Sequence, residues 1–303
     1  MISNQFVYPF CHYMQSKAYA GFMQKLGWEV EIISTRADLV YLYSKKVPLL
    51  GSVAKIPRST VSLPMDLVDQ AAKEKKALFV KIEPSATLDK MDALPEGFRK
   101  DSPILHTKTI LVDLAPIPEK IEKSFKGDVR TCIRKALKEN LVVQESNDLG
   151  QFYALFEKTA KERGFYHPYK KQMKNLRDAF FSQVKLFLAF QKPLEKHPDP
   201  LAGCLVITHN QVAYYKYAAS TPAGRKKGAS YLCLWKAMVA CKKTGCHTFD
   251  LEGIADERYP QTRKYSNFTH FKQSWGGKEI TYLGSFAKPY STFYKLLSKI
   301  ELI

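Results

Sequence analysis

The stretch GCLVITHNQVAYYKYAAS, residues 203–220, decides the fold of this chain. It holds two runs of strand length, GCLVITH and VAYYKYA, rich in β-branched and aromatic residues. Another strand-like run, KLFLAF, begins at Lys185. Beyond the stretch, apolar residues recur at helical spacing from Tyr231 to Met238, Gly245 marks a stop, and the strand-like run HTFDL follows. The sequence therefore predicts three strands, a helix and a further strand, and a helix over residues 170–181 precedes them.

The first half of the chain has the same order of predicted elements. A helical pattern ends at Gly27, and the strand-like runs EVEIIST, LVYLYS and LLGSVAKI follow. A helix over residues 65–75 then leads into the strand ALFVKIEP. This repeated order predicts a duplicated α/β module, and acyltransferases of the GNAT type have the same order. We expect two GNAT-like domains in tandem, with mixed sheets flanked by helices: residues 1–139, completed by the C-terminal segment 284–303, and residues 140–283.

Size, charge and hydropathy limit the functional classes. The 303 residues carry 47 Lys plus Arg against 29 Asp plus Glu, and the net charge of +18 favours polyanionic partners such as RNA, a nucleotide diphosphate or an anionic membrane face. The apolar runs are far shorter than the ~20 residues that cross a bilayer, and the N-terminus lacks a secretion signal. We expect a cytoplasmic monomer, peripheral to the inner membrane face. The six cysteines have no zinc-finger spacing, so neither a metal nor a cofactor is expected.

A basic and apolar segment separates the two predicted halves. Between residues 120 and 138, Ile121, Phe125, Val129, Ile133 and Leu137 recur every four residues, next to the cations Lys126, Arg130, Arg134 and Lys138. Because four-residue steps drift on a helix of 3.6 residues per turn, both stripes wind around it, and Gly127 is a point where it can divide. The segment is either a solvated covering helix or a basic ridge that binds phosphates.

A lone lysine between aromatic residues is the strongest candidate for catalysis. In FTHFKQSWGGKEITYLG, residues 268–284, Lys272 stands between Phe271 and Trp275, and Gly276 and Gly277 follow. Aromatic neighbours leave a lysine poorly hydrated, and paired glycines let a backbone or a ligand approach closely. One interpretation is a fixed positive charge inside a site. The other is a strand with a snorkelling lysine and a glycine bulge.

Three further groups have both a functional and a structural interpretation. The loop TPAGRKKGAS, residues 221–230, places Arg225, Lys226 and Lys227 ahead of Gly228 at a helix start, which suits anion binding or a solvated basic turn. Asp250 and Glu252 are candidates to orient or deprotonate an attacking amine, or to pair with lysines. Tyr215 and Tyr217, expected on one sheet face, could stack on a base or sugar, or pack in the core. The absence of GxSxG, HExxH and Cys–His motifs argues against a hydrolase.

Taken together, these motifs resemble the FemABX family of peptidoglycan-bridge aminoacyltransferases. The resemblance runs nearly from end to end, through YMQSKAYAGFMQKLGWE, KIPRSTV, ALFVKIEP, TKTILVDL, VRTCIRKALKENLVV, YYKYAAS, FDLEGI and HFKQSWGG. It implies two GNAT-like domains and transfer of an amino acid from aminoacyl-tRNA to an amine of the stem pentapeptide, in the UDP-linked precursor or lipid II. No DNA partner is implied.

The resemblance also implies roles for individual residues. Lys272 matches the family lysine that stabilises the oxyanion of the tetrahedral intermediate. Lys25 matches a lysine that binds the precursor diphosphate, although Met23 competes for that place in the alignment. The other residues that we expect to bind substrate are Arg58, Tyr215, Tyr217, Arg225, Phe271 and Trp275.

The chain departs from the family pattern in two ways. Where relatives carry an arginine after a Gly-Phe pair, Gly164 and Phe165 are followed by YHPYKK, which leaves Lys170 or Arg225 as replacements. The coiled coil that some relatives use to hold tRNA is also missing, so the basic ridge of Lys126, Arg130, Arg134 and Lys138 would have to bind it. An acyl-CoA-dependent N-acyltransferase, suggested by RKKGAS, and a non-catalytic RNA-binding protein remain alternatives. The transferred amino acid, the form of the acceptor and the acceptor residue stay open.

Overall fold

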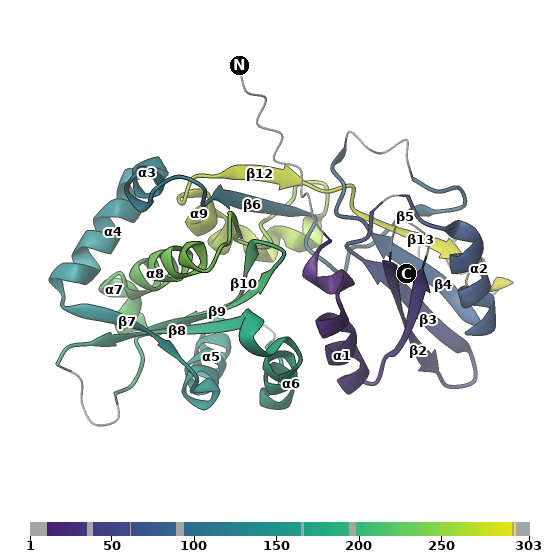
Figure 1. The fold of residues 1–303 in the computed structure, drawn as a ribbon, viewed down its shortest axis with the longest axis horizontal. Coiled ribbons are helices and arrows are strands. Elements are labelled where there is room, and N and C mark those ends of the chain that lie inside the picture. Colours follow the sequence, from purple (N-terminus) through teal and green to yellow (C-terminus); the bar gives the residue numbers. More distant parts are fainter. Residues whose placement is uncertain are drawn as a thin grey trace, which may run out of the picture. The chain divides into compact units, whose positions relative to one another are not determined.

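A computed structural model describes residues 11–34, 39–60, 62–88, 94–164, 167–193, 198–292 and 294. Phe165 and residues 295–303 of the expected C-terminal segment lie outside the described residues. The chain divides into two compact units, one of residues 1–107 and 281–303 and the other of residues 108–280 (Figure 1).

The first unit is a six-stranded mixed sheet with the order β1-β2-β3-β4-β13-β5. Neighbouring strands are antiparallel except β3 and β4, which run parallel and are joined by the crossover helix α2. Val68 of α2 is fully buried against strand residues such as Ile56 and Val80. The elements are η1 (Tyr13–Gln15), α1 (Lys17–Lys25), β1 (Glu29–Ser34), β2 (Leu39–Val47), β3 (Gly51–Pro57), α2 (Met65–Glu74), β4 (Ala77–Glu83), β5 (Arg99–Asp101) and β13 (Ser285–Pro289).

The second unit is a seven-stranded mixed sheet with the order β12-β6-β11-β10-β9-β8-β7. β10 and β11 run parallel and are again joined through a helix, α8. Its strands are β6 (Lys108–Asp113), β7 (Leu141–Ser146), β8 (Val184–Gln191), β9 (Ala202–His209), β10 (Val212–Ser220), β11 (Thr248–Asp250) and β12 (Lys278–Thr281). Its helices are α3 (Pro118–Ser124), α4 (Gly127–Lys138), α5 (Leu149–Arg163), α6 (Lys170–Phe180), η3 (Phe181–Gln183), α7 (Pro222–Lys226), α8 (Ala229–Lys243), η4 (Pro260–Tyr265) and α9 (Ser266–Gln273).

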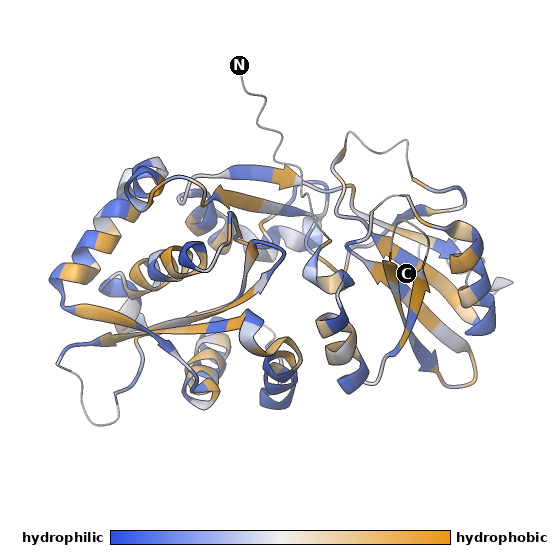
Figure 2. Cartoon of the chain, viewed as in Figure 1, coloured by the Kyte–Doolittle hydropathy of each residue, from blue (hydrophilic) through white to orange (hydrophobic). Residues whose placement is uncertain are grey.

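Helices cover both faces of the second sheet. In Figure 1, α4 and α8 lie on one face and α5 and α6 on the other. The core beneath α4 and α8 contains Ile133, Trp235, Phe249 and Trp275. Figure 2 shows hydrophobic residues concentrated along strands such as β8 and β9, while much of α6 is hydrophilic. The predicted α/β class, with mixed sheets flanked by helices, is confirmed.

The boundary between the units differs from the expected one after residue 139. Residues 108–139 belong to the second unit because β6 pairs with β11 and α4 packs against α8. β13, from the C-terminal part of the chain, lies in the first sheet between β4 and β5. None of the described helices has the length and apolar content needed to cross a bilayer. The longest of them, α5 and α8, have 15 residues each.

Candidate active site

Lys272 lies on a helix, so the interpretation of its segment as a strand was wrong. The helix α9 ends at Gln273, and Gly276 and Gly277 turn the chain into β12 with φ values of 68° and 84°. A Cβ atom on Gly276 would lie 2.8 Å from the carbonyl oxygen of Ser124, and one on Gly277 would lie 2.5 Å from that of Leu111. The glycine pair therefore allows the backbone of α3 and β6 to approach closely, because any side chain at these two positions would collide with it.

The Lys272 ammonium is held by a backbone carbonyl. Nζ donates a hydrogen bond of 2.7 Å to the oxygen of Gly253, three residues beyond the end of β11. Burial lowers the pKa of Lys272 to about 8, against the opposing effects of Glu252 and Asp250, and Lys216 adds to the lowering. At neutral pH this lysine is therefore mostly a cation that is poorly hydrated, which suits stabilisation of an oxyanion.

The aromatic neighbours of Lys272 in sequence pack against other aromatic residues. Phe271 packs edge-on against Tyr231, with ring centroids 5.0 Å apart, and Trp275 packs at 5.0 Å against Phe125. Trp275 is fully buried, so it has no exposed surface with which to contact a substrate. Its expected role in substrate binding is replaced by a structural one, and Phe271 is partly buried against the same core.

The two acidic residues that follow the lysine-rich helix α8 have different environments. Asp250, at the end of β11, is fully buried, and its Oδ1 accepts hydrogen bonds from the Thr109 hydroxyl and from the Glu252 amide, the latter at 2.7 Å. Glu252 lies beyond the strand with φ 56°, so strand alternation does not govern its direction. Its carboxylate lies 3.5 Å from Lys216 Nζ. Asp250 therefore fixes the backbone at Glu252. The Glu252 carboxylate is the one that forms an ion pair, with Lys216.

Tyr215 and Tyr217 lie on opposite faces of the sheet, which corrects the expectation of a shared face. The register shifts between them, so Tyr215 pairs with Val206 while Tyr217 pairs with the adjacent Leu205. Lys216 is the extra residue of this β-bulge. Tyr215 packs in the core under α8, near Phe249, and Tyr217 packs against Phe156 of α5 on the other face. The two rings cannot line one channel together.

Arg225 lies in the short helix α7, and its guanidinium is held by contacts within the protein. Arg225 Nη1 donates to the oxygen of Ser220 at 2.5 Å, and Nη2 lies 3.8 Å from Glu162. A Cβ atom on Gly228, at the start of α8, would lie 2.5 Å from the Cys132 carbonyl oxygen of α4. A backbone carbonyl so close to the helix start leaves little room for a pyrophosphate and repels one, which argues against an acyl-CoA site there.

Two expected substrate-binding residues belong to the first unit. Arg58 is buried with φ 53°, and its Nη2 donates to the His106 oxygen at 2.5 Å while the guanidinium stacks 4.1 Å from the Tyr282 ring centroid. Lys25 is exposed in the last turn of α1, where a cation stabilises the helix end.

The basic segment divides into two helices, as Gly127 indicates. Phe125 and Lys126 are extended between α3 and α4, and Phe125 fills the core between Trp235 and Trp275. The predicted drift of the apolar stripe is confirmed, because Ile121, Phe125, Val129 and Ile133 are buried while Leu137 is 51% exposed.

The four cations of the basic ridge are not equivalent. Arg130 Nη1 binds the carbonyl oxygens of Lys123 and Phe125 at 2.9 and 2.7 Å, so it holds the corner between α3 and α4. Lys126, Arg134 and Lys138 are exposed. Of the four cations, these three are the ones that solvent exposes to a polyanion.

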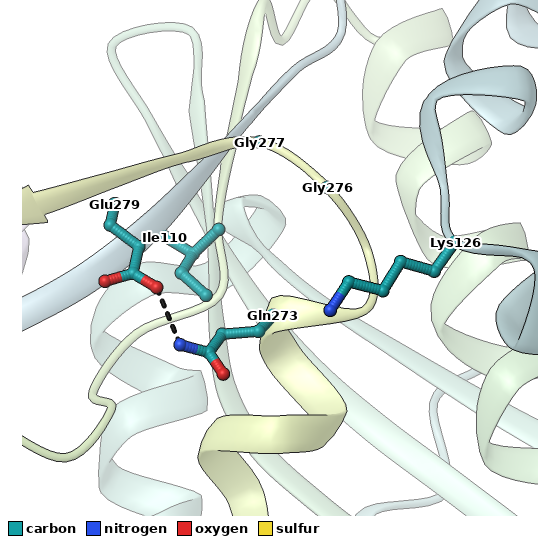
Figure 3. Close-up of a pocket in the computed structure, with 6 residues that line it drawn as sticks. All are labelled: Ile110, Lys126, Gln273, Gly276, Gly277 and Glu279. Atoms are coloured by element: carbon teal, nitrogen blue, oxygen red, sulfur yellow. Dashed lines mark hydrogen bonds between the residues drawn. The ribbon is translucent and has the colours of Figure 1, made fainter.

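A hollow of about 280 Å³ lies beside the C-terminal end of α9 (Figure 3). It is lined by Ile110, Lys126, Gln273, Gly276, Gly277 and Glu279, and Gln273 donates to Glu279 at 2.7 Å. Lys126 points toward the end of α9, where a cation complements the free carbonyl groups. Lys272 is not among the lining residues. No group of His, Cys, Asp and Glu suited to a metal occurs within the described ranges.

Sequence reasoning missed Thr109, Lys216 and the Gly253 carbonyl as parts of the site. Thr109 comes from β6, Lys216 from the β10 bulge and Gly253 from the loop after β11, so their meeting depends on the order of strands in the sheet. The motif FDLEGI contains Gly253 next to Glu252, but it does not indicate that the Gly253 carbonyl accepts a hydrogen bond. Nothing in YYKY indicates the bulge.

Comparisons with known proteins agree with this fold. Residues 189–301 match the model of the FemAB family. The crystal structure of FemX matches with a TM-score of 0.84 and 20% sequence identity over 97% of this chain and 95% of that one. The C-terminal domain (DUF2156) of a protein assigned as a lysylphosphatidylglycerol synthetase from Agrobacterium fabrum has a TM-score of 0.60 at 11% identity, covering 94% of this chain and 91% of that one. For L-PGS from Bacillus licheniformis the TM-score is 0.56 at 12% identity, with 94% of both chains covered. No curated protein matches at the significance that we required.

The fold is therefore that of FemX and related structures, and the family match lies in the second unit and the C-terminal segment. The chain is thus similar to the FemAB family over residues 189–301 and to FemX in its fold, in agreement with the resemblance drawn from the sequence motifs. The matched residues 189–301 include Lys216, Glu252 and Lys272.

Proposed function

We propose that this protein is an aminoacyltransferase that moves an amino acid from aminoacyl-tRNA to the side-chain amine of the stem pentapeptide in a peptidoglycan precursor. The observation that carries the proposal is the Lys272 ammonium, poorly hydrated and held 2.7 Å from the Gly253 carbonyl within the segment that matches the FemAB model. A lysine in this setting is a cation that can transfer its hydrogen bond to a developing oxyanion.

The reaction is aminolysis of an activated ester. The neutral amine nitrogen attacks the ester carbonyl carbon, a C–N bond forms, and the C=O π pair moves onto the carbonyl oxygen. Collapse of this tetrahedral intermediate restores the C=O bond and breaks the C–O bond to the terminal ribose of the tRNA. The ribose oxygen takes up one proton, and the attacking nitrogen loses one. The ester supplies the driving force, so the protein mainly orients the amine and stabilises negative charge.

Lys272 and Glu252 have complementary roles in this mechanism. The Lys272 ammonium donates a hydrogen bond to the oxyanion, since its pKa of about 8 leaves it mostly protonated at pH 7. The Glu252 carboxylate is only 12% exposed and is the group placed to attract the incoming amine and to receive its proton. Asp250 acts through Glu252 by binding its amide.

The basic ridge is the proposed binding surface for tRNA. Lys126, Arg134 and Lys138 are exposed, and each phosphate contact releases a condensed counterion. Arg130 contributes by holding the corner between α3 and α4 in place. In the first unit, the exposed Lys25 is the proposed ligand of the precursor diphosphate, and the buried Arg58 supports the neighbouring backbone.

The experiment that tests this function supplies both substrates together. The protein is incubated with a mixture of charged tRNAs and the UDP-linked pentapeptide, and the precursor is analysed by mass spectrometry. An increase by one aminoacyl mass is expected, and its size identifies the amino acid. Lys272→Met serves as the inactive control.

Parallel reactions distinguish the alternatives. Replacement of charged tRNA by acetyl-CoA tests whether the protein is an acyl-CoA-dependent N-acyltransferase. Acetylation of the precursor in that reaction would refute the proposal. Binding of charged and uncharged tRNA with equal affinity, without modification of the UDP-linked precursor or of lipid II, would favour an RNA-binding protein.

A further inference from the structure

The bulge in β10 brings a second lysine into the site of Lys272. Tyr215 and Tyr217 pair with the adjacent residues Val206 and Leu205, so Lys216 has no place of its own in the ladder. A bulge redirects the side chain of its extra residue. Here it brings Lys216 Nζ to 3.5 Å from the Glu252 carboxylate, and the side chains of the two partners are only 21% and 12% exposed. An ion pair this enclosed is little screened by solvent.

Glu252 is fixed at its backbone as well as at its carboxylate. Its amide donates to Asp250 Oδ1 at 2.7 Å, and the same oxygen accepts the hydroxyl of Thr109 from β6. Its φ of 56° is unusual for a residue with a side chain, and the following carbonyl, that of Gly253, binds Lys272. The direction of the Glu252 side chain and the position of the Lys272 acceptor are thus set by one short segment.

Charged groups of both signs act on the Lys272 ammonium. The groups that act on its ammonium are the carboxylates Glu252 and Asp250 from the end of β11 and the ammonium of Lys216 from β10. Of the two carboxylates, Glu252 is the one that pairs with Lys216, while Asp250 binds the Thr109 hydroxyl and the Glu252 amide. Without Lys216, both carboxylates would act on Lys272 alone and would hold it as a tight ion pair, which is a poorer hydrogen-bond donor to an oxyanion.

We propose that Lys216 is a positioning residue, which pairs with Glu252 and thereby keeps the Lys272 ammonium on the Gly253 carbonyl and available to the reacting oxygen. Its consequence for turnover rests on the aminoacyl transfer proposed above. Its effect on Lys272 itself does not, and can be measured without any substrate.

The substrate-free measurement follows the protonation of Lys272. Each protein is labelled with a small anhydride across pH 6 to 11, and the extent of Lys272 acylation is quantified by peptide mass spectrometry, with exposed lysines in the same sample as an internal standard. Lys216→Met should move the midpoint for Lys272 upward by about 0.5 to 1 pH unit, because a repelling cation is removed. Glu252→Gln should move it downward by a similar amount, and Lys216→Arg should leave it near that of the unchanged protein.

Turnover supplies the second readout. Lys216→Met should lower kcat about tenfold at pH 7 and shift the alkaline limb of the pH profile upward, and Lys216→Arg should restore most of both. Lys174→Met, on the exposed face of α6, is the matched control and should change neither. Circular dichroism and the thermal midpoint show whether each variant is folded. If Lys216→Met is not folded, the downward shift expected of Glu252→Gln and the unchanged midpoint expected of Lys216→Arg carry the test.

Specific outcomes would overturn the inference. An unchanged Lys272 midpoint in both Lys216→Met and Glu252→Gln would mean that the pair does not act on Lys272. Equal loss of turnover in Lys216→Arg and Lys216→Met, with unshifted profiles, would leave only a packing role. If the unchanged protein transfers no aminoacyl group, the proposed function fails, while the labelling experiment still decides the role of Lys216.

Discussion

Replacement of Lys272 by methionine should make the protein a poorer catalyst and a more stable fold. Methionine keeps most of the volume of the side chain and removes the ammonium that donates to the oxyanion. Loss of one oxyanion donor typically costs about 10²–10³ in kcat, or about 3–4 kcal/mol of transition-state stabilisation. Because the interaction develops in the transition state, we expect kcat to fall by about 10²-fold or more while binding of the precursor changes little.

The gain in stability follows from the pKa of the same lysine. Its value of about 8 in the folded protein, against 10.5 for an ordinary lysine, corresponds to a penalty of about 3 kcal/mol for keeping the charged form folded at pH 7. The residue is partly exposed, and its removal leaves the Gly253 carbonyl without a donor at a cost of about 1 kcal/mol. We therefore expect a net stabilisation of about 1–2 kcal/mol at pH 7.

The pH dependence identifies the cause of that gain. Between pH 8 and 10.5 the unfolded chain holds the proton that the folded protein has released, so the stability of the unchanged protein rises over this range. The advantage of Lys272→Met should be complete below pH 8 and should shrink as the pH approaches 10.5.

Urea unfolding at pH 7 and pH 10, followed by tryptophan fluorescence, measures the difference, since Trp235 and Trp275 are buried in the unit that carries Lys272. Precursor modification by mass spectrometry measures turnover. Near-normal turnover of Lys272→Met would remove the lysine from the mechanism. A loss of stability that is the same at both pH values would refute the argument from burial.

Three further predictions concern the parts that support the site. Gly277→Ala places a Cβ atom 2.5 Å from a β6 carbonyl at a φ of 84°, so it should destabilise the protein by about 2–4 kcal/mol in urea unfolding, whereas Gly21→Ala, in an open helical position, should be neutral or slightly stabilising; equal effects would contradict the steric argument. Arg130→Gln removes two hydrogen bonds to carbonyl oxygens at the α3–α4 corner and should lower the free energy of unfolding by about 1–2 kcal/mol. A thermal melt would detect this loss, and an unchanged melt would show that the corner does not depend on Arg130. Lys138→Gln should reduce by about one the slope of log K against log salt for tRNA binding, while Lys174→Gln should not, and identical slopes would place the tRNA elsewhere.

Local sequence patterns determined much of this fold. Helix and strand periods predicted the repeated order of three strands, helix and strand, because side-chain direction in each element depends on neighbours a few residues away. The four-residue spacing from Ile121 to Leu137 predicted an apolar stripe that winds around the helix, and the structure adds that Leu137 is exposed. The FemABX-like motifs predict a catalytic role for Lys272 from the sequence alone.

Only the tertiary structure decided what surrounds Lys272. A single extra residue in β10 turned Tyr215 and Tyr217 to opposite faces and carried Lys216 to Glu252, and a bulge of this kind depends on pairing with β9, which no local period records. Trp275, adjacent in sequence to the site, lies in the core because Phe125 reaches it from the corner between α3 and α4. The sequence by itself determined which elements form, since those depend on short-range patterns, and it predicts a catalytic role for Lys272. The sheet order decided which charges meet that lysine, since they come from strands that are distant along the chain.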